Sequence, residues 1–279
     1  MEERQSREGT PHSARNRDRR KGPQGRVAAR RPRLPLSKIA VVTGASSGIG
    51  AATARELTRR GWKCVLLARG RDRLEPLATE LGAEFEVCDV ADRAQVEHVA
   101  ATVLERHPKV ALLVNNAGIP GRGDFLTLEP ELIESVLATN YLGGVWCSRA
   151  FLAGLGSGSH IANVVSVAGT VALAASGPYA ASKHAQLAFS RAVGGTLGAR
   201  GVVVHTILPG FVETEGFPQR ARLGERLYRL VVGPELVAAR LVDAVEGGKR
   251  EVYVPRWYRV FAVAQAVAPA LVARISARL

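Results

Sequence analysis

The amino-acid sequence predicts an α/β protein built on a doubly wound, seven-stranded parallel sheet. Short apolar runs alternate along the chain with longer segments of helical periodicity, which indicates repeated β-α units and a sheet covered by helices on both faces. The first apolar run passes through a glycine-rich turn into a helical segment. The length of 279 residues suits one α/β domain, and the sequence contains no internal repeat.

The apolar runs mark the strands, and the periodic segments between them mark the helices. We expect strands near residues 39–43, 63–68, 84–88, 110–115, 159–166, 202–208 and 251–254. We expect helices near residues 48–60, 72–81, 92–106, 130–150, 178–199 and 234–246. These elements form a single domain over residues 37–256, in which ligands bind beyond the carboxyl ends of the strands.

The turn after the first strand has the spacing Gly-x-x-x-Gly-x-Gly at Gly44, Gly48 and Gly50, which differs from the common Gly-x-Gly-x-x-Gly of dinucleotide sites. Gly44 permits a tight turn, Gly48 lets backbone amides approach a pyrophosphate, and Gly50 allows close packing of helix on strand. Taken alone, the segment could also be a plain turn without a ligand.

Tyr179 and Lys183, in Tyr-Ala-Ala-Ser-Lys, form a candidate proton-transfer site with Ser166. If Pro178 opens a helix, Tyr179 and Lys183 stand one turn apart on the same face. A lysine ammonium beside a phenol favours the phenolate and lowers the pKa of the tyrosine, and a serine hydroxyl can hold the oxygen that gains or loses the proton. The alternative is a surface helix on which this pair has no catalytic role.

The motifs occur together and in a characteristic order: Thr43-Gly44-x-x-x-Gly48-Ile49-Gly50, Asn115-Asn116-Ala117-Gly118, Ser166 and Tyr179-x-x-x-Lys183. In these motifs the sequence resembles the short-chain dehydrogenase/reductase family in its single-domain form, over about residues 38–255. The resemblance implies a Rossmann-type fold and an oxidoreductase that uses a nicotinamide cofactor.

The resemblance also implies roles for individual residues. Tyr179 would be the general acid/base, and Ser166 would stabilise the substrate oxygen. Lys183 would bind the nicotinamide ribose, and Asn140 would hold a water of a proton relay. The cofactor would contact Gly44, Ser46, Ser47, Gly48, Ile49, Gly50, Arg69, Asp89, Val90, Asn116, Ala117, Gly118, Tyr179, Lys183, Pro209, Gly210, Val212 and Thr214. No metal site is expected.

The residues that end the second strand bear on the choice of cofactor. A site selective for NAD usually places an acid there to accept from the ribose 2′-hydroxyl, whereas this chain has Ala68 followed by Arg69. A guanidinium suits a 2′-phosphate, so we predict NADP(H) over NAD(H). The alternative is that Arg69 and Arg71 are ordinary surface charges; Ser47 also stands where NADP-dependent relatives often carry a basic residue.

The expected lid, residues 211–232, bears on the substrate. Its apolar and aromatic residues favour a hydrophobic ketone, aldehyde or alcohol over a sugar, and its arginines either accept an acidic tail or form the solvated face of a helix. We therefore predict an NADP(H)-dependent oxidoreductase acting on a small hydrophobic carbonyl or alcohol. The alternative is a redox sensor that binds the nucleotide without turnover. Nucleic-acid binding would rest on the N-terminal arginines alone and is not expected.

The net charge of +13 is concentrated at the two ends of the chain. Residues 1–38 contain 12 Lys/Arg and 4 Asp/Glu, residues 247–279 contain 6 and 1, and the residues between them are neutral overall. Residues 1–36 are rich in Arg, Pro, Gly and Ser, so we predict a disordered basic extension and no signal peptide. The extension is either simply solvated or an arm for an anionic partner.

Residues 257–279 are mostly apolar at near-helical spacing and are flanked by arginines. The longest uncharged run, Val260 to Ala273, has fourteen residues and is too short to span a bilayer as a helix. The pattern suits a helix lying on an anionic membrane, a lid over the substrate cleft, or a dimer contact. We expect a cytoplasmic protein, peripheral to the membrane under the first of these alternatives.

Glycines and cysteines support two further expectations. The helix after Lys183 contains Gly194-Gly195, which cost about 1 kcal/mol each in a helix and would be explained by a close helix–helix approach. The resemblance places that helix in a subunit interface, so we predict a homodimer or homotetramer. Three cysteines, Cys64, Cys88 and Cys147, are expected to be free thiols in a reducing compartment.

Overall fold

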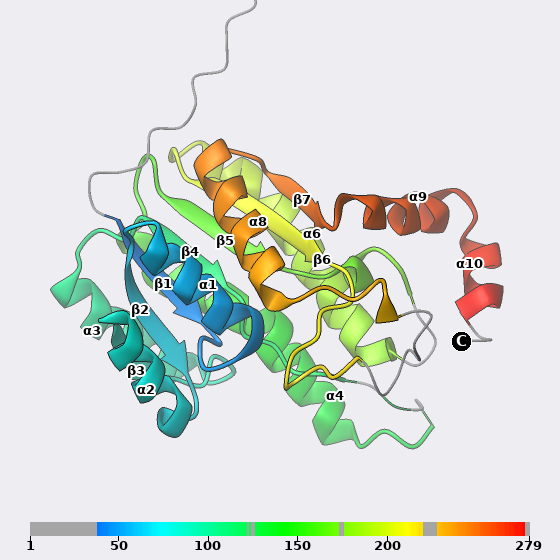
Figure 1. Cartoon of the computed structure of the whole chain (residues 1–279), viewed down its shortest axis with the longest axis horizontal. Coiled ribbons are helices and arrows are strands. Elements are labelled where there is room, and N and C mark those ends of the chain that lie inside the picture. The colour runs from blue at the N-terminus through cyan, green and yellow to red at the C-terminus, as the bar shows by residue number, and fades with distance from the viewer. Residues whose placement is uncertain (1–37, 122, 124–125, 173–175, 220–227, 277–279) are drawn as a thin grey trace, which may run out of the picture. The chain divides into compact units, whose positions relative to one another are not determined.

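The computed structural model describes residues 38–276 with gaps at 122, 124–125, 173–175 and 220–227, so the predicted basic extension lies outside the described residues. The strands are β1 Ile39–Thr43, β2 Lys63–Ala68, β3 Glu84–Val87, β4 Leu112–Asn115, β5 His160–Val164, β6 Val203–Pro209 and β7 Glu251–Val254. They form one sheet in the order β3-β2-β1-β4-β5-β6-β7, with every neighbouring pair parallel, which confirms the predicted fold class (Figure 1).

Helices cover both faces of the sheet (Figure 1). Those of the domain body are α1 Gly48–Arg59, α2 Arg71–Leu81, α3 Arg93–Arg106, α4 Pro130–Leu137, α5 Gly143–Ala150, α6 Gly177–Gly198 and α8 Pro234–Gly247. The first face packs against α1, α2 and α8, and the second against α3, α5 and α6. Strand β1 alternates accordingly: Ala40 and Val42 belong to the core of the first face, and Ile39 and Val41 to the core of the second.

Two predicted helices are divided, while the other predicted elements agree with the structure within two residues at each end. The predicted helix 130–150 is α4, a π-helical turn at Ala138–Leu142, and α5. The predicted C-terminal helix 257–279 is instead a 3₁₀ turn at Arg256–Tyr258, α9 Arg259–Val267 and α10 Pro269–Ser276. Pro269 explains this second break: it lacks an amide hydrogen and disfavours a helical Ala268, whose φ is −137° and ψ 60°.

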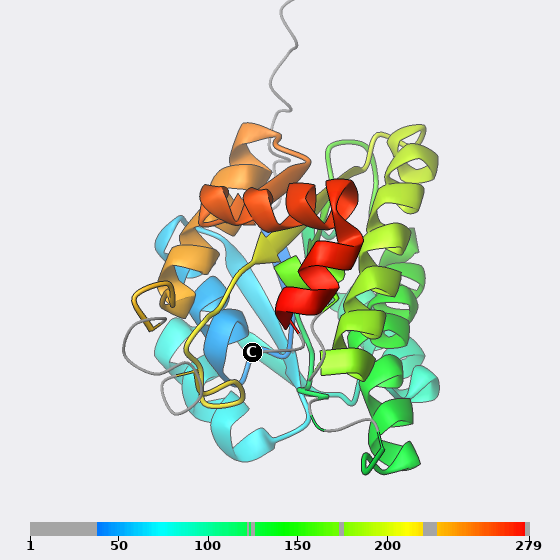
Figure 2. The ribbon, with the colours of Figure 1, turned by 90° about the vertical axis from the view of Figure 1, so that its right-hand side faces the viewer.

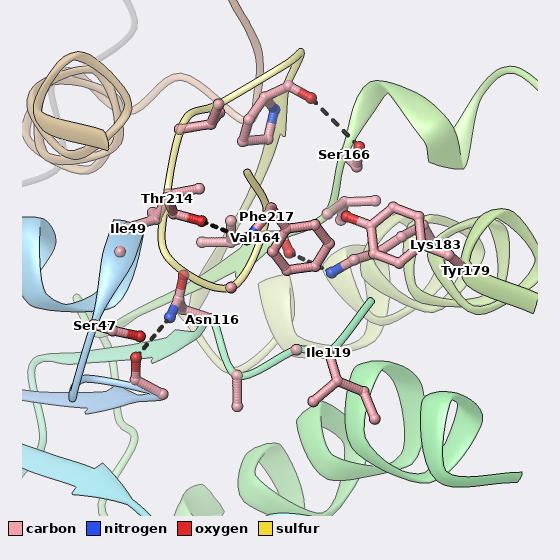
Figure 3. A pocket seen from close by; sticks show the side chains of 18 of the residues that line it. Ser47, Ile49, Asn116, Ile119, Val164, Ser166, Tyr179, Lys183, Thr214 and Phe217 are labelled. Carbon is pink, nitrogen blue, oxygen red and sulfur yellow. Dashed lines mark hydrogen bonds between the residues drawn. The ribbon is translucent and has the colours of Figure 1, made fainter. Parts of the chain in front are cut away.

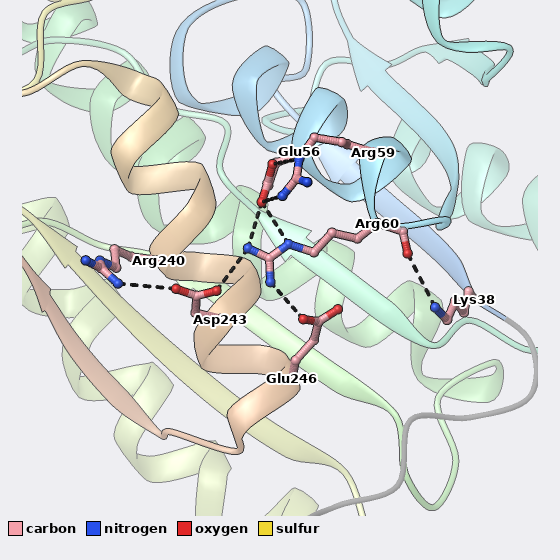
Figure 4. Close-up of polar contacts among 7 residues, drawn as sticks. All are labelled: Lys38, Glu56, Arg59, Arg60, Arg240, Asp243 and Glu246. Carbon is pink, nitrogen blue, oxygen red and sulfur yellow. Dashed lines mark hydrogen bonds and ion pairs between the residues drawn. The ribbon is translucent and has the colours of Figure 1, made fainter.

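Arg60 joins α1 to α8 on the first face (Figure 4). Its guanidinium forms ion pairs with Glu56 at 2.7 Å, Asp243 at 2.9 Å and Glu246 at 2.7 Å, and its side chain is only 19% exposed. Three carboxylates offset the cost of removing this charge from water. The network holds the C-terminal end of α1, the helix that begins at the glycine turn.

A row of polar side chains crosses three strands on the second face. Asn115 on β4, Asn163 on β5 and Thr206 on β6 are in register. Asn115 Nδ2 donates to Asn163 Oδ1 at 2.9 Å, and Asn163 Nδ2 donates to Ser190 Oγ on α6 at 2.9 Å. Ser190 Oγ lies 2.7 Å from Thr206 Oγ1. These buried hydrogen bonds tie α6, which carries the predicted catalytic pair, to the sheet.

Candidate active site

A cavity of about 920 Å³ lies at the carboxyl ends of the strands. The glycine turn and the ends of β2 and β3 line one part of it, and Ser166, Tyr179 and Lys183 line another. Figure 3 shows these three side chains together with Ser47 and Ile49 of the glycine turn. In this sheet the chain order reverses between β1 and β4, which is where open α/β sheets bind ligands. The cavity is lined by every predicted site residue except Gly50 and Asn140.

The glycine turn has the conformation that its spacing predicts. Gly44 has a φ of 63°, and a Cβ added there would lie 2.7 Å from Ala117 Cα. A Cβ on Gly50 would lie 2.1 Å from the carbonyl oxygen of Gly44, so only glycine lets α1 approach the strand this closely. Gly48 has a φ of 53°, and its Cβ would contact the side chain of Thr214 at 3.1 Å. Without a side chain at Gly48, the first residue of α1, a phosphate group can approach the backbone amides at the N-terminus of the helix.

Thr43 and Asn116 hold this turn against the end of β4. Thr43 Oγ1 donates to Val114 O at 3.1 Å and accepts from the backbone amides of Asn116 and Ala117 at 3.0 and 3.1 Å. Asn116 Nδ2 donates to the carbonyl oxygens of Thr43 and Gly44 at 3.0 and 3.2 Å. Asn116 therefore shapes the cavity floor by fixing the backbone.

Three arginines lie near the end of β2, and they differ in position. Arg69 is exposed and lines the cavity, with its Nη1 4.0 Å from Asp89 Oδ2. Arg73 also lines the cavity and pairs with Glu215 at 2.9 Å, a contact that sequence reasoning missed because the partners are 142 positions apart. The Arg71 guanidinium instead lies 5.3 Å from the centre of a neighbouring phenylalanine ring and does not line the cavity.

The catalytic candidates converge from two elements. Ser166 follows β5; its Oγ accepts from Ala168 N at 3.1 Å and lies 3.5 Å from Pro209 O. Tyr179 is in the first turn of α6, which has proline near its start as predicted. Lys183 is one turn later, with its Nζ 5.8 Å from the centre of the Tyr179 ring. A phenol, an ammonium and a hydroxyl on one wall of a cavity can move a proton at a carbonyl oxygen.

Lys183 is buried, and its ammonium group has two neutral acceptors. Nζ donates to Val164 O at 3.0 Å and to Gln186 Oε1 at 2.8 Å. Burial lowers the pKa of Lys183 to about 7, whereas bonds to carbonyl oxygens favour the charged form. Sequence reasoning missed Gln186, which is 2% exposed. The available signal was an amide three positions after Lys183, on the helix face that packs against the sheet.

Asn140 is buried in the π turn, and its side chain does not line the cavity. Its Oδ1 accepts from Ile119 N at 2.8 Å, and its Nδ2 donates to Ile119 O at 3.0 Å and to Ser182 Oγ at 3.1 Å. The amide therefore joins the segment after β4 to the helix turn that carries Lys183. Its predicted hold on a water molecule stays a prediction.

Tyr258, which follows β7, supports two segments of the cavity wall. Its hydroxyl donates to Leu230 O at 3.1 Å and accepts from Phe211 N at 3.3 Å. A Cβ on Gly210 would lie 2.2 Å from the Tyr258 ring, so glycine is required beneath it. Sequence reasoning did not identify Tyr258 as a site residue, because only the fold brings β7 beside the loop that follows β6.

His184 and the three cysteines are not among the converging catalytic candidates. His184 lies outside the cavity lining and bonds to Ala180 O at 2.8 Å. The three cysteines are free and buried. Cys88 borders the cavity, but burial raises the pKa of its thiol to about 11, as it does for Cys64. Neither of these thiols is poised to act as a nucleophile.

Comparison with known proteins identifies the family. The family model described as "short chain dehydrogenase" matches residues 38–222. The chain is a member of the short-chain dehydrogenase/reductase family. It is therefore an oxidoreductase of a family that uses nicotinamide cofactors, as its motifs predicted.

Individual short-chain dehydrogenase/reductase relatives support this assignment. A "Putative ketoacyl reductase" of Streptomyces coelicolor is 37% identical over 187 residues, which cover 64% of this chain and 72% of that protein. A structure of F189W actinorhodin polyketide ketoreductase with NADPH has a TM-score of 0.69 and 31% identity, covering 78% of this chain and 95% of the other. A Burkholderia phymatum family member in complex with NAD has a TM-score of 0.75 and 27% identity, covering 85% and 95%.

Proposed function

We propose that the protein is an NADP(H)-dependent oxidoreductase that interconverts a hydrophobic ketone or aldehyde and its alcohol, with Tyr179 as general acid/base. The observation that carries this proposal is one cavity that contains both the glycine turn and the three side chains Ser166, Tyr179 and Lys183. Its volume of about 920 Å³ is at the upper end of the range for small-molecule sites, as a site for a dinucleotide and a substrate must be.

The residues of the cavity fit a dinucleotide. The cradle at Gly48 would hold the pyrophosphate at the N-terminus of α1, where free amides and the helix dipole favour an anion. Asp89 and Val90 would contact the adenine, and Val212 and Thr214 the nicotinamide carboxamide. All four of these residues line the cavity.

The end of β2 favours NADP(H). Arg69 borders the cavity, and Ala68 leaves the last position of β2 without a carboxylate. A guanidinium there would pair with a 2′-phosphate. Among the similar structures, the actinorhodin ketoreductase is with NADPH and the Burkholderia phymatum protein with NAD, so the preference follows from this chain's own residues.

The catalytic side chains act on the substrate oxygen. A bound nicotinamide supplies or accepts the hydride at the substrate carbon. In the reductive direction Tyr179 donates its phenolic proton to the substrate oxygen, and Ser166 donates a hydrogen bond that stabilises the developing negative charge. Lys183 binds the nicotinamide ribose and, as an ammonium, favours the phenolate that Tyr179 becomes. A water near Asn140 would return the proton from solvent.

The cavity wall supports a hydrophobic substrate. The segments after β6 and β7 contribute five large apolar or aromatic side chains to it: Phe211, Phe217, Leu230, Tyr258 and Phe261. Of the lid arginines that could accept an acidic tail, Arg220, Arg222 and Arg226 lie outside the described residues. Hydrophobic ketones and aldehydes are therefore the first substrates to test, together with ketoacyl compounds, which the name of the Streptomyces coelicolor relative mentions.

We also propose that the enzyme is a homo-oligomer that pairs through α6. Added Cβ atoms show that Gly195 has open space around it among the described residues and that Gly194 would reach no closer than 3.8 Å to Val204. Within the described part of this chain, no other element packs so closely against α6 that Gly194 or Gly195 must be glycine. A second copy would account for them.

The test is oxidation of NADPH and NADH by the purified protein with a panel of hydrophobic ketones, aldehydes and ketoacyl thioesters. Tyr179→Phe should lower kcat by about 100- to 10,000-fold, because it removes the proton donor. The dissociation constant of NADPH, measured by fluorescence titration, should stay within about twofold. A Tyr179→Phe variant that keeps its turnover contradicts the proposed role, and tight NADPH binding without turnover on any compound favours the sensor alternative.

A further inference from the structure

The C-terminal helices carry their large apolar side chains on the outside. Of the twelve large apolar residues that are exposed among the described residues, seven lie between Trp257 and Ile275. On α9 the half-buried positions include Ala262, Ala264 and Gln265, and no residue of this helix is fully buried. A surface helix normally turns its large apolar residues to the core. In α9 the arrangement is reversed, because most of the large apolar side chains face outward and small or polar residues are half-buried.

Five of these side chains form the C-terminal apolar surface. Val260, Val263 and Val267 lie at helical spacing on α9 and are 65%, 53% and 79% exposed. Leu271 and Ile275 lie one turn apart on α10 and are 57% and 54% exposed. Figure 1 shows both helices beyond the end of β7, and Figure 2 shows them together at the front of the domain. The two helices therefore belong to one outer face.

Positive charge borders this surface. Arg256, Arg259 and Arg274 are exposed and take part in none of the ion pairs between described residues. The sequence contains no Asp or Glu after Glu251. Exposed apolar side chains flanked by arginines without acidic partners complement an anionic lipid surface.

The helices are arranged to lie on a bilayer and not to cross it. No single helix among the described residues is long and apolar enough to span a membrane. The segments Arg256–Val267 and Pro269–Ile275 reach the required length and composition only together, and they are bent by 114°. A pair bent this sharply is not a straight span, but each helix can lie along a surface.

We propose that the C-terminal apolar surface docks on an anionic lipid bilayer, with its apolar side chains at the boundary of headgroups and acyl chains and its arginines at the lipid phosphates. The other candidate occupant is a second copy of the chain. A symmetric contact through this face would bring together the arginines of both copies, and the segment offers no carboxylate to pair with them. The charge pattern therefore favours lipid.

Docking would bring the cavity close to the bilayer. Phe261 on α9 is 40% exposed and also lines the cavity, and its ring centre lies 5.6 Å from that of Tyr258. A hydrophobic substrate dissolved in lipid would then enter the cavity beside α9. This consequence rests on the proposed function; the docking itself does not, because it is measured without cofactor or substrate.

The experiment uses the full chain and phosphatidylcholine vesicles with and without phosphatidylserine, some containing lipids brominated on the acyl chain. Trp257 is 43% exposed beside the surface, whereas Trp62 is 2% exposed and Trp146 lies on α5, partly buried against the core of the second face. Bromine in the acyl region should quench the fluorescence of Trp257 in the wild type, and Trp257→Phe should remove most of that quenching. Vesicle flotation gives the affinity in parallel.

Two triple variants separate the contributions of apolar area and charge. Val263→Ser/Val267→Ser/Leu271→Ser keeps the net charge and should abolish the quenching and weaken vesicle binding at least about 10-fold. Arg256→Gln/Arg259→Gln/Arg274→Gln keeps the apolar area and should weaken binding to phosphatidylserine vesicles by roughly 100-fold, with little effect on phosphatidylcholine. All substituted side chains are exposed, so melting temperatures should match the wild type.

Three results would overturn the proposal. The first is a wild type that floats with vesicles while Trp257 is not quenched. The second is a serine variant that binds vesicles as tightly as the wild type, which would assign the binding to basic residues and not to the C-terminal apolar surface. The third is a wild type that does not bind vesicles but forms an oligomer, while the serine variant is a monomer and the arginine variant is not. That result would assign the surface to a contact with a second copy.

Discussion

Burial and hydrogen bonding have opposite effects on the pKa of the Lys183 ammonium. Its side chain is 3% exposed, and burial lowers the pKa of its ammonium to about 7. The carbonyl oxygens of Val164 and Gln186 accept two of its three hydrogens and oppose that effect. A small change in either acceptor should therefore alter the charge of Lys183 near neutral pH and, through it, the phenolate of Tyr179.

Gln186→Leu tests this balance. Without the side-chain acceptor the ammonium is less favoured, so Tyr179 needs a higher pH to become phenolate. In the oxidative direction, the acid limb of the kcat–pH profile should move up by about 0.5 to 1 pH unit. Gln186→Glu should move it down, because a carboxylate favours the ammonium. If both variants instead lower kcat by the same factor at every pH, Gln186 has only a packing role.

Arg69→Gln tests the cofactor preference. Removing the guanidinium should raise the KM for NADPH about 10-fold, because a charge-assisted hydrogen bond to the 2′-phosphate is lost, and should leave the KM for NADH unchanged. Arg71→Gln is the matched control, since Arg71 stacks on a neighbouring ring outside the cavity. If the preference for NADPH over NADH is kept in Arg69→Gln but lost in Arg73→Gln, the 2′-phosphate pairs with Arg73 and not with Arg69.

At the scale of elements, strands β5 and β6 share a buried pair of histidines. His160 Nδ1 lies 2.9 Å from His205 Nε2, and His205 Nδ1 donates to Lys249 O at 2.7 Å. With Nδ1 of His205 donating, the bond between the rings requires His160 Nδ1 to donate as well. His160 Nε2 is then left buried without a partner. A proton added there has no acceptor, and burial lowers the pKa of His160 to about 4.

The pair predicts acid sensitivity of the fold. The folded-state pKa of His160 is below the ordinary value of 6.5, so between pH 6.5 and about 4 His160 is protonated in the unfolded chain and neutral in the folded chain. The free energy of unfolding should fall as pH drops from 6.5 to about 4, by about 1.4 kcal/mol per pH unit for this group. Urea unfolding at pH 7 and pH 5 should show a smaller loss in His160→Gln, which cannot titrate. Equal losses in the two proteins would contradict this assignment.

For the whole molecule, the net positive charge lies at the two ends of the chain and not in the residues between them. The residues between 38 and 247 are neutral overall, and the excess of Lys and Arg lies at the two ends of the chain. Under the two proposals, the ends of the chain attract anionic partners, whereas the cavity holds the cofactor and the substrate. The C-terminal end combines its positive charge with the C-terminal apolar surface, and its Phe261 also lines the cavity. We therefore assign membrane docking to this end of the chain.

The sequence alone determined the fold class, nearly all strand and helix positions, and most of the cavity. Local rules are sufficient for these features. Gly44 and Gly48 adopt the positive φ that their turn predicts, and Tyr179 and Lys183 lie one turn apart because helical spacing requires it. The family motifs then place the remaining site residues, all but Gly50 and Asn140 at the cavity wall.

Only the tertiary structure decided the contacts between distant segments. Arg73 with Glu215, Tyr258 with Gly210, and His160 with His205 join positions between 45 and 142 residues apart. Hydrophobic periodicity carries no information about such pairs. The same holds for α9: its spacing predicts a helix, but which side faces the protein depends on what packs against it. A residue's chemistry can be read from the sequence, whereas its partner is set by the fold.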